Sequence, residues 1–256
     1  MSLSVSTGII MLIGLTAHLL RVVVRRAVTE PQAQRLLREV IAASELCGCC
    51  FELAIVADTF GVITYAVYLF LVSIYWSLAW GDANACPYLQ VEEWWLGRTR
   101  LPTVLLRILA EVAGGWATWR YIRLLWRLEL SPAHHDRWLE ECSADLQVSP
   151  LQGALVEGVA VLLCRLVARS MDDLEPRFAV AIDSLCGTSL VIAGFNYSGG
   201  YYNPMLASAM KLGCRGHSVG EHVAVYWGAA TVGAVASTYL YPVLRPTLTN
   251  RPLKRE

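Results

Sequence analysis

Long stretches of the chain carry no charged side chain, and this pattern predicts the secondary structure. The stretches without Asp, Glu, Lys or Arg are residues 1–20, 60–81, 184–210 and 223–244. Because a helix of about 20 residues crosses a bilayer core about 30 Å thick, apolar runs of this length are candidate membrane spans. Together with three runs that contain one to three ionisable residues, they predict seven spans, at residues 5–25, 36–57, 60–80, 102–126, 150–170, 178–197 and 222–244. We therefore expect an all-α membrane protein.

The first segment has one alternative interpretation, a cleaved signal peptide. Signal peptides carry their positive charge before the apolar run and a small-residue cleavage site after it. Here Arg21, Arg25 and Arg26 follow the apolar run, and no small-x-small site precedes them. The pattern therefore favours an additional hydrophobic helix that is retained.

Composition narrows the class of protein further. Only 16% of the 256 residues are charged, against about 25% in average soluble domains, which excludes an ordinary soluble globule. Disordered chains are polar and highly charged, so disorder is excluded as well. The 21 basic and 21 acidic residues balance, and a neutral chain lacks the electrostatic footprint of a nucleic-acid binder. We find no glycine-rich phosphate loop or nucleophile elbow and expect no enzymatic activity and no cofactor.

The placement of arginine predicts the orientation in the membrane. Five arginines follow the first segment, and four basic residues follow the last one: Arg21, Arg25, Arg26, Arg35 and Arg38, then Arg245, Arg251, Lys254 and Arg255. Short basic connections usually stay in the cytosol, so both regions are expected there, with six spans between them. Arg120, Arg123 and Arg127 disagree with this orientation, because it puts them at the opposite end of a helix.

Two halves of the chain repeat one pattern. Glu39 lies in an apolar helix 47 positions before Cys86, and Glu157 lies in another 46 positions before Asn203. Cys86 and Asn203 each begin a proline-containing tripeptide. Each tripeptide leads into a segment too short to span a membrane, at residues 88–96 and 205–212. Three segments per half, with an odd number of crossings, give an inverted repeat, and short broken helices at matching places indicate a midplane site.

These tripeptides resemble the paired pore motifs of the aquaporin family, in particular of its unorthodox aquaporin-11 and aquaporin-12 members. Asn203-Pro204-Met205 is similar to the second Asn-Pro-Ala motif, and Cys86-Pro87-Tyr88 to a degenerate first one. The resemblance covers residues 34–244. It implies six spans plus two re-entrant half-helices, with the N-terminal hydrophobic helix added.

The resemblance also implies how the two motifs work. The half-helices would meet at mid-membrane by their N-termini, whose free N–H groups and partial positive charge repel cations. Asn203 would donate its amide to the passing solute, whereas Cys86 offers a weak donor or packs as a small apolar residue. Glu39 and Glu157 would accept hydrogen bonds from the re-entrant loops, whose backbone must be satisfied by protein. Glu52 falls near a helix end, where we expect solvation, and Glu45 has no assigned role.

Family spacing places the outer selectivity filter at Ala66, Val191, Gly200 and Leu206. The family's usual arginine is replaced by Leu206, which removes a positive charge and a fork of donors. We expect a wide, apolar filter that discriminates weakly between water and small neutral solutes such as glycerol or hydrogen peroxide. A hydrophobic constriction that dewets and conducts poorly is the alternative.

The cysteines and histidines do not predict a metal site. A structural zinc ion needs four ligands, and Cys47, Cys49 and Cys50 lie in an apolar helix without a nearby histidine. His134, His135 and His217 are expected to be solvated loop residues. Similar aquaporins carry cysteines at the places of Cys142 and Cys214, and in an oxidising lumen these two could form a disulfide.

The sequence therefore predicts three regions: an N-terminal helix and basic linker (1–33), a channel domain (34–245) and a basic cytosolic tail (246–256). The expected function is a passive channel for water and small neutral solutes in a lipid bilayer. The alternative is an aquaporin-fold scaffold that conducts weakly or not at all. The family implies a homotetramer. Lys254 and Arg255 near the C-terminus resemble a retrieval signal of the endoplasmic reticulum, although a basic tail also follows from the positive-inside bias.

Overall fold

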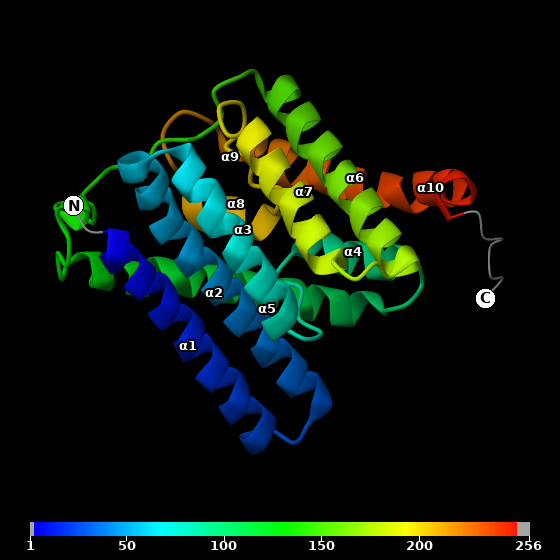
Figure 1. The fold of residues 1–256 in the computed structure, drawn as a ribbon, viewed down its shortest axis with the longest axis horizontal. Helices are drawn as coiled ribbons and strands as arrows, with labels where there is room; N and C mark the ends of the chain where they lie inside the picture. The colour runs from blue at the N-terminus through cyan, green and yellow to red at the C-terminus, as the bar shows by residue number, and fades with distance from the viewer. Residues whose placement is uncertain (1–2, 250–256) are drawn as a thin grey trace.

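The computed structural model describes residues 3–249 and is helical throughout that range, apart from loops and one isolated β-bridge between Ser143 and Arg215 (Figure 1). The expected retrieval signal at Lys254 and Arg255 lies outside the described residues. In chain order the helices are α1 (Leu3–Ala27), α2 (Pro31–Phe60), α3 (Val62–Ala79), α4 (Pro87–Trp95), α5 (Leu101–Trp126), the 3₁₀-helix η1 (Pro132–His134), α6 (Pro150–Leu174), α7 (Ala179–Gly194), α8 (Pro204–Lys211), α9 (Val219–His222), the π-helical turn η2 (Val223–Ala229) and α10 (Ala230–Thr249).

All seven predicted spans are helical, with α9, η2 and α10 continuing one another as the last. Five of these segments are long and apolar enough to cross a membrane by themselves: α1, α2, α3, α6 and Val219–Arg245. α7 is apolar but has only 16 residues. α5 has 26 residues but carries charged side chains, among them Arg107 and Glu111. The all-α membrane fold expected from the sequence is confirmed.

Proline determines where many of these helices begin. Pro31, Pro87, Pro150 and Pro204 each stand at the first helical position, where the missing N–H costs nothing and the fixed φ suits the helix. Capping side chains complete the starts of some of these helices. In α6, Ser149 and Gln152 form a reciprocal capping box, which satisfies backbone donors that a helix leaves free.

The two halves pack in the same way. α2 lies against α5 in the first half, and α6 lies against α10 in the second. At each contact a glycine lets the backbones approach: a Cβ on Gly114 would collide with the Val40 carbonyl, and one on Gly233 with the Gly158 carbonyl. Such small-residue contacts are the usual way for helices to associate in a membrane.

The bundle has an arginine-rich end and a disulfide end. At the arginine-rich end, α1 finishes with Arg25 and Arg26 and α2 begins at Pro31. At the disulfide end, Cys142 in the loop after α5 is bonded to Cys214 in the loop after α8, with 5.0 Å between their Cα atoms. Backbone bonds between Arg215 and the Cys142 and Ala144 residues join the same two loops.

The extra helix α1 lies at one edge of the molecule beside α2 (Figure 1). A buried ion pair joins the two helices, because Arg21 Nη1 donates to Glu45 Oε2 at 2.6 Å and their side chains are 4% and 0% exposed. Trp80 Nε1 donates to the same carboxylate oxygen at 2.9 Å. Glu45, which had no assigned role, thus connects α1 to the six-helix repeat.

Two expectations about polar residues at the disulfide end were wrong. Glu52 and His134 are both fully buried, and Glu52 Oε1 lies 3.1 Å from His134 Nε2. The 3₁₀-helix η1 folds back onto the end of α2 and covers both groups. His217 is half-buried, not solvated, and stacks on His222 with ring centroids 5.1 Å apart.

The arginines that disagreed with the predicted orientation are held by aromatic rings. Arg120 lies 4.8 Å from the ring centroid of Trp116, and Arg127 lies 4.3 Å from that of Trp138. Arg123 donates to the Trp138 carbonyl at 2.9 Å. Cations near a helix C-terminus are also favoured by its dipole, so local contacts account for these charges.

Candidate pore and its two half-helices

Asn203 connects the two re-entrant motifs at the centre of the molecule. Its Oδ1 accepts from the backbone N–H groups of Met205 and Leu206 at 3.0 and 3.3 Å, and thereby caps α8. Its Nδ2 donates to the Ala85 carbonyl at 2.8 Å, across to the loop before α4. An amide nitrogen carries two hydrogens, so one donor of Asn203 is left for a solute.

Cys86 stands at the equivalent position of α4 but makes no capping bond. Its thiol is 5% exposed and belongs to an apolar cluster with Tyr88, Ala160 and Ala230. The pseudo-twofold relation between the half-helices is therefore broken at this residue. One motif presents an amide and a capped helix, and the other presents a thiol at a helix start that has no side-chain cap.

Two buried glutamates support the two loops in the same manner. Glu39 Oε2 accepts from the N–H groups of Asn84 and Ala85 at 2.9 and 3.0 Å. Glu157 accepts from the N–H groups of Tyr201 and Tyr202 at 3.1 and 2.7 Å. Both glutamates are 0% exposed, and an unsatisfied backbone group at this depth would cost several kcal/mol. These bonds hold each loop in the shape that points its half-helix inward.

Glu111 of α5 is a buried acid that the sequence reasoning did not single out. Gln90 Nε2 lies between Glu39 Oε1 at 3.1 Å and Glu111 Oε1 at 2.9 Å, so α2, α4 and α5 meet at one amide. The signal was present, since Glu111 interrupts an apolar run and Gln90 lies in a short half-helix. What the sequence did not give was their mutual contact.

The outer end of each half-helix is fixed by ion pairs that the sequence reasoning also missed. Glu92 of α4 is almost fully buried and binds Arg165 of α6 through two N–H donors, at 2.9 and 2.8 Å. Arg169 donates to the same carboxylate at 2.6 Å, and its side chain is 16% exposed. At the end of α8, Lys211 Nζ lies 2.8 Å from Asp145 Oδ1. Ion pairs therefore anchor both half-helices in the bundle.

A cavity of about 480 Å³ opens above Asn203 toward the disulfide end, and we call it the vestibule. Three of the four expected filter residues line it: Val191 of α7, Gly200 of the re-entrant loop and Leu206 of α8. Gly200 is required by the backbone, because its φ is +64° and a Cβ there would lie 2.5 Å from the Val191 carbonyl oxygen.

The fourth expected filter residue, Ala66, does not line the vestibule, and its neighbour Tyr65 does. The Tyr65 ring lies 5.6 Å from that of Phe195, which lines the same cavity. A one-residue change rotates the position by about 100° around α3. The wall thus contains an aromatic ring where a methyl group was expected.

Met205 points away from the vestibule and into the packing between helices. Its Sδ lies 3.4 Å from Cys47 Sγ of α2. Gly115 of α5 leaves space for it, since a Cβ on that glycine would come within 2.6 Å of the Met205 sulfur. Cys47 and Gly115 therefore accommodate the large residue that stands in place of the alanine of the family motif.

Charged side chains surround the mouth of the vestibule. Arg137 pairs with Asp58, Lys211 pairs with Asp145, and all four residues line the cavity. Arg137 belongs to the loop that the Cys142–Cys214 bond attaches to the loop after α8. Two cationic side chains, each paired with a carboxylate, thus lie at the mouth of the cavity that Leu206 also lines.

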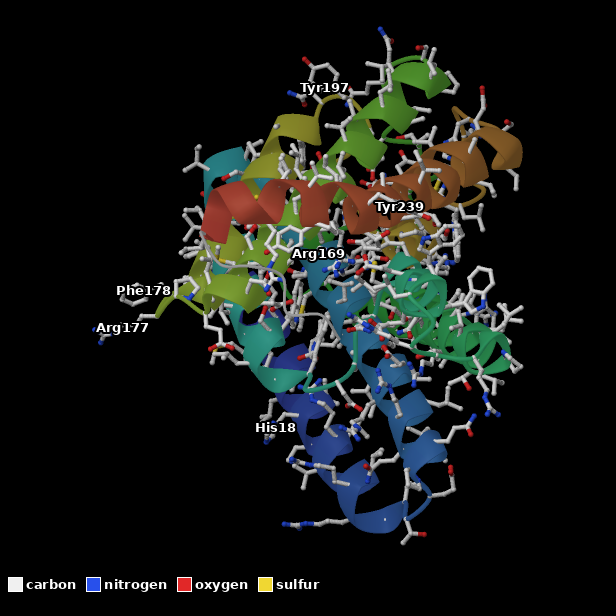
Figure 2. The ribbon with its side chains drawn as sticks, turned by 90° about the vertical axis from the view of Figure 1, so that its right-hand side faces the viewer. His18, Arg169, Arg177, Phe178, Tyr197 and Tyr239 are labelled. Carbon is white, nitrogen blue, oxygen red and sulfur yellow. A yellow bond between two sulfur atoms is a disulfide. The ribbon has the colours of Figure 1, made fainter. Side chains whose placement is uncertain are left out.

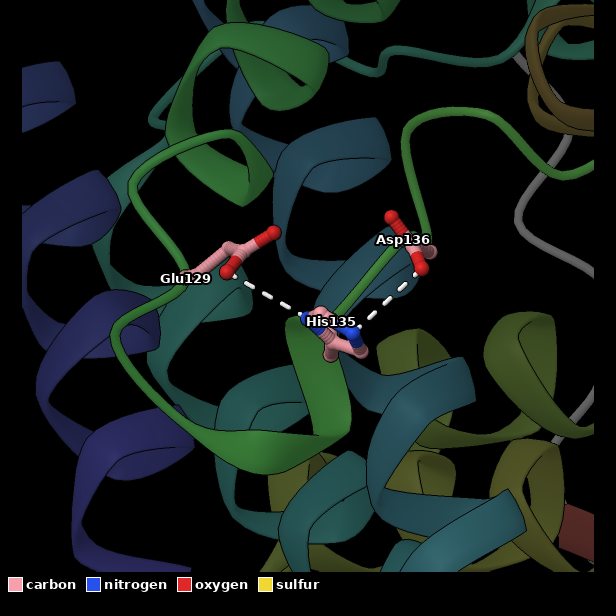
Figure 3. A group of neighbouring side chains, drawn as sticks. All are labelled: Glu129, His135 and Asp136. Atoms are coloured by element: carbon pink, nitrogen blue, oxygen red, sulfur yellow. Dashed lines mark ion pairs between the residues drawn. The ribbon is translucent and has the colours of Figure 1, made fainter.

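One group of side chains has the geometry of metal ligands but lies on the surface. His135 stands between Glu129 and Asp136, with a nitrogen–oxygen distance of 3.3 Å on each side (Figure 3). The three side chains are 44% to 68% exposed. Exposed carboxylates beside a histidine form ion pairs without any metal, so this group adds no site to the candidate pore.

Comparisons with known proteins agree with this geometry. No family model matches the chain. Aquaporin-11 of Milnesium tardigradum is 28% identical over 215 residues, which cover 83% of this chain and 78% of that protein. Aquaporin-12 of Mus musculus is 26% identical over 84% of this chain and 77% of that protein. Aquaporin-11 of Homo sapiens is 24% identical over 96% of this chain and 91% of that protein.

The fold also matches a solved structure. The aquaglyceroporin of Plasmodium falciparum superposes with a TM-score of 0.65 at 11% identity, covering 86% of this chain and all of that one. Similar sequences over most of the length, two half-helices that meet at Asn203 and the shared fold lead to one conclusion. The chain is similar over most of its length to unorthodox aquaporins of the aquaporin-11 and aquaporin-12 type, and it shares the fold of an aquaglyceroporin.

Proposed function

We propose that the chain conducts water and small neutral solutes passively across a membrane. The observation that carries this proposal is the bond from Asn203 to the Ala85 carbonyl at the floor of the vestibule. It brings the N-terminal ends of α4 and α8 together, and two positive helix ends at one point disfavour cations. The remaining amide hydrogen of Asn203 offers a hydrogen bond that a neutral solute can accept.

The walls of the vestibule favour weak discrimination among such solutes. Val191, Leu206 and Gly200 present apolar or minimal side chains, and Tyr65 is the larger group opposite them. With no arginine fork at Leu206, a solute is selected by size more than by polar contacts. Glycerol and hydrogen peroxide are therefore proposed as permeants beside water.

The test is osmotic swelling of proteoliposomes compared with empty vesicles. The wild-type protein is expected to raise water permeability above the vesicle background. Val191→Trp fills the vestibule and is expected to return permeability to that background. Leu185→Trp is the matched control on the same helix, because Leu185 is 56% exposed and does not line the vestibule. Wild-type vesicles that swell no faster than empty ones would contradict the proposal.

The solute range is tested on the same vesicles by glycerol and peroxide uptake. Leu206→Arg restores the charge and the donors of the usual filter. It is expected to lower glycerol uptake more than water flow, because the guanidinium narrows the vestibule. Equal loss of both fluxes would argue against selection at Leu206.

A scaffold that conducts little is the second candidate, and one observation favours it. Among residues 3–249, the vestibule is lined down to Asn203 and Trp76, whereas Cys86 and Tyr88 below them do not line it. The two side chains are only 5% and 8% exposed. If the region at Cys86 and Tyr88 stays closed, vesicles that contain the wild-type protein will swell no faster than empty ones, although the protein is folded.

Two finer proposals rest on the family resemblance and on the tail. We propose a homotetramer, expected to show four times the 28.3 kDa protomer mass in detergent.

We also propose residence in the endoplasmic reticulum through Lys254 and Arg255. Replacing both by Ala should release the protein to the cell surface, and strong surface staining of the unmodified protein would contradict it.

A further inference from the structure

A groove runs along the extra helix α1, outside the pore. Its two sides are α1 and α3, and α2 contributes Cys49 and Arg38 to it. The groove consists of two adjoining cavities of about 440 and 430 Å³, which share His18 and Tyr75. Tyr75 links the two sides, because its hydroxyl donates to the Gly14 carbonyl at 3.2 Å and accepts from Arg21 Nη2 at 3.3 Å.

The half of the groove nearer the bundle centre is apolar. It is lined by Met11 and Leu15 of α1 and by Leu71 and Val72 of α3. Met11 is 69% exposed and Leu15 and Leu71 are each 57% exposed, so these walls face the surroundings of the bundle. In a membrane those surroundings are acyl chains.

The other half of the groove is cationic. Arg21, Arg25 and Arg38 line it together with His18, and no acidic residue of the described range lines it. Figure 2 shows His18 projecting from the side of α1. Two of the arginines have acidic partners, Glu45 for Arg21 and Asp82 for Arg38. Their Nε atoms are buried without a hydrogen-bond partner, and Arg25 has no ion-pair partner within residues 3–249.

The two halves are ordered along the membrane normal. In both α1 and α3 the residues that line the apolar half precede those that line the cationic half, so the two helices run in the same direction past the groove. Charge therefore increases toward the arginine-rich end, where α1 leaves the bilayer. An apolar slot that ends in arginines at the membrane surface has the polarity of a phospholipid with an acidic headgroup.

We propose that this groove binds one acidic phospholipid, with an acyl chain between α1 and α3 and the headgroup at Arg21, Arg25 and Arg38. Basic pockets between helices at the membrane surface are a recognised way to hold anionic headgroups. The exposed Arg25 and the half-buried Arg38 supply the charge and the N–H donors that such a headgroup needs. The chain's own C-terminal tail does not suit this place, because Arg251, Lys254 and Arg255 carry the same sign of charge.

The experiment is native mass spectrometry of the full chain in detergent, titrated with phosphatidylserine or with phosphatidylcholine of the same acyl chains. One phosphatidylserine is expected to bind several-fold more tightly than phosphatidylcholine. Arg25→Gln is expected to weaken phosphatidylserine binding about fivefold, the contribution of one basic side chain near an anionic headgroup. Arg26→Gln is the matched control, because Arg26 is exposed on the same turn but does not line the groove.

A second pair of variants tests the apolar half. Leu15→Trp fills the groove and is expected to lower phosphatidylserine binding. Leu12→Trp, at a residue 55% exposed on α1 outside the groove, should leave it unchanged. Neither residue belongs to the pore, so a failed swelling assay would not affect this result.

Three outcomes would overturn the proposal. Equal binding of phosphatidylserine and phosphatidylcholine would show that the groove does not recognise an acidic headgroup. If Arg25→Gln and Arg26→Gln weaken phosphatidylserine binding equally, the lipid is attracted to a basic surface and is not bound in the groove. Displacement of the lipid by millimolar inorganic phosphate, with no effect of Leu15→Trp, would mean a simple anion site that does not hold an acyl chain.

Discussion

Asn203 and Cys86 stand at equivalent positions of the two half-helices, yet only Asn203 caps its helix. The Asn203 side chain satisfies two N–H groups of α8 and still reaches the opposite loop. Cys86 leaves the first N–H groups of α4 without a side-chain partner. Single residues thus decide how alike the two halves of the pore are, even where the backbone repeats.

Cys86→Asn should restore the missing cap. An asparagine at the N-cap stabilises a helix by about 1 kcal/mol relative to a residue that cannot accept from its N–H groups. We expect a higher melting temperature in detergent and faster swelling of proteoliposomes, since a second amide then lies on the path below the vestibule. Cys86→Ala is the control and should give neither gain. A faster flow without a higher melting temperature would argue against capping as the cause.

At the scale of elements, each half-helix is supported at both ends. Glu39 and Glu157 bind the loops before α4 and α8, and ion pairs at Glu92 and Lys211 fix the far ends. α1 is attached differently. Its only buried ion pair within the described residues is Arg21–Glu45, so this pair is the natural place to test how α1 is held.

Arg21→Met should weaken the attachment of α1 strongly. The change leaves the Glu45 carboxylate buried with only Trp80 as a donor, and breaking one partner of a buried pair costs about 3–5 kcal/mol. The melting temperature is expected to fall. Arg21→Met combined with Glu45→Leu should recover most of the loss, because no charge is then buried. Arg26→Met, at an exposed position, is the control; a double variant as unstable as the single one would contradict this account.

For the whole molecule, the membrane fold could be predicted because its signals lie along the chain. Apolar runs, proline starts and the paired glutamates are one-dimensional patterns. The filter could be predicted only in part: α3 is apolar on all sides, so nothing in its sequence distinguishes Tyr65 from Ala66. Contacts such as Glu52 with His134 join residues 82 positions apart, and no local pattern reports them.

The disulfide end ties distant parts of the chain into one unit, which gives a prediction for the whole molecule. The Cys142–Cys214 bond closes a loop with a sequence separation of 72, and a cross-link of that length stabilises a chain by up to about 4 kcal/mol. Reduction with dithiothreitol is expected to lower the melting temperature of the wild-type protein. The double variant Cys142→Ser, Cys214→Ser should have the melting temperature of the reduced wild-type protein, and dithiothreitol should not change it. The other cysteines within residues 3–249 are free thiols, so a response of the double variant to dithiothreitol would show that the effect has another origin. Because Arg137 at the vestibule mouth lies in the bonded loop, the same reduction should also change the rate of swelling.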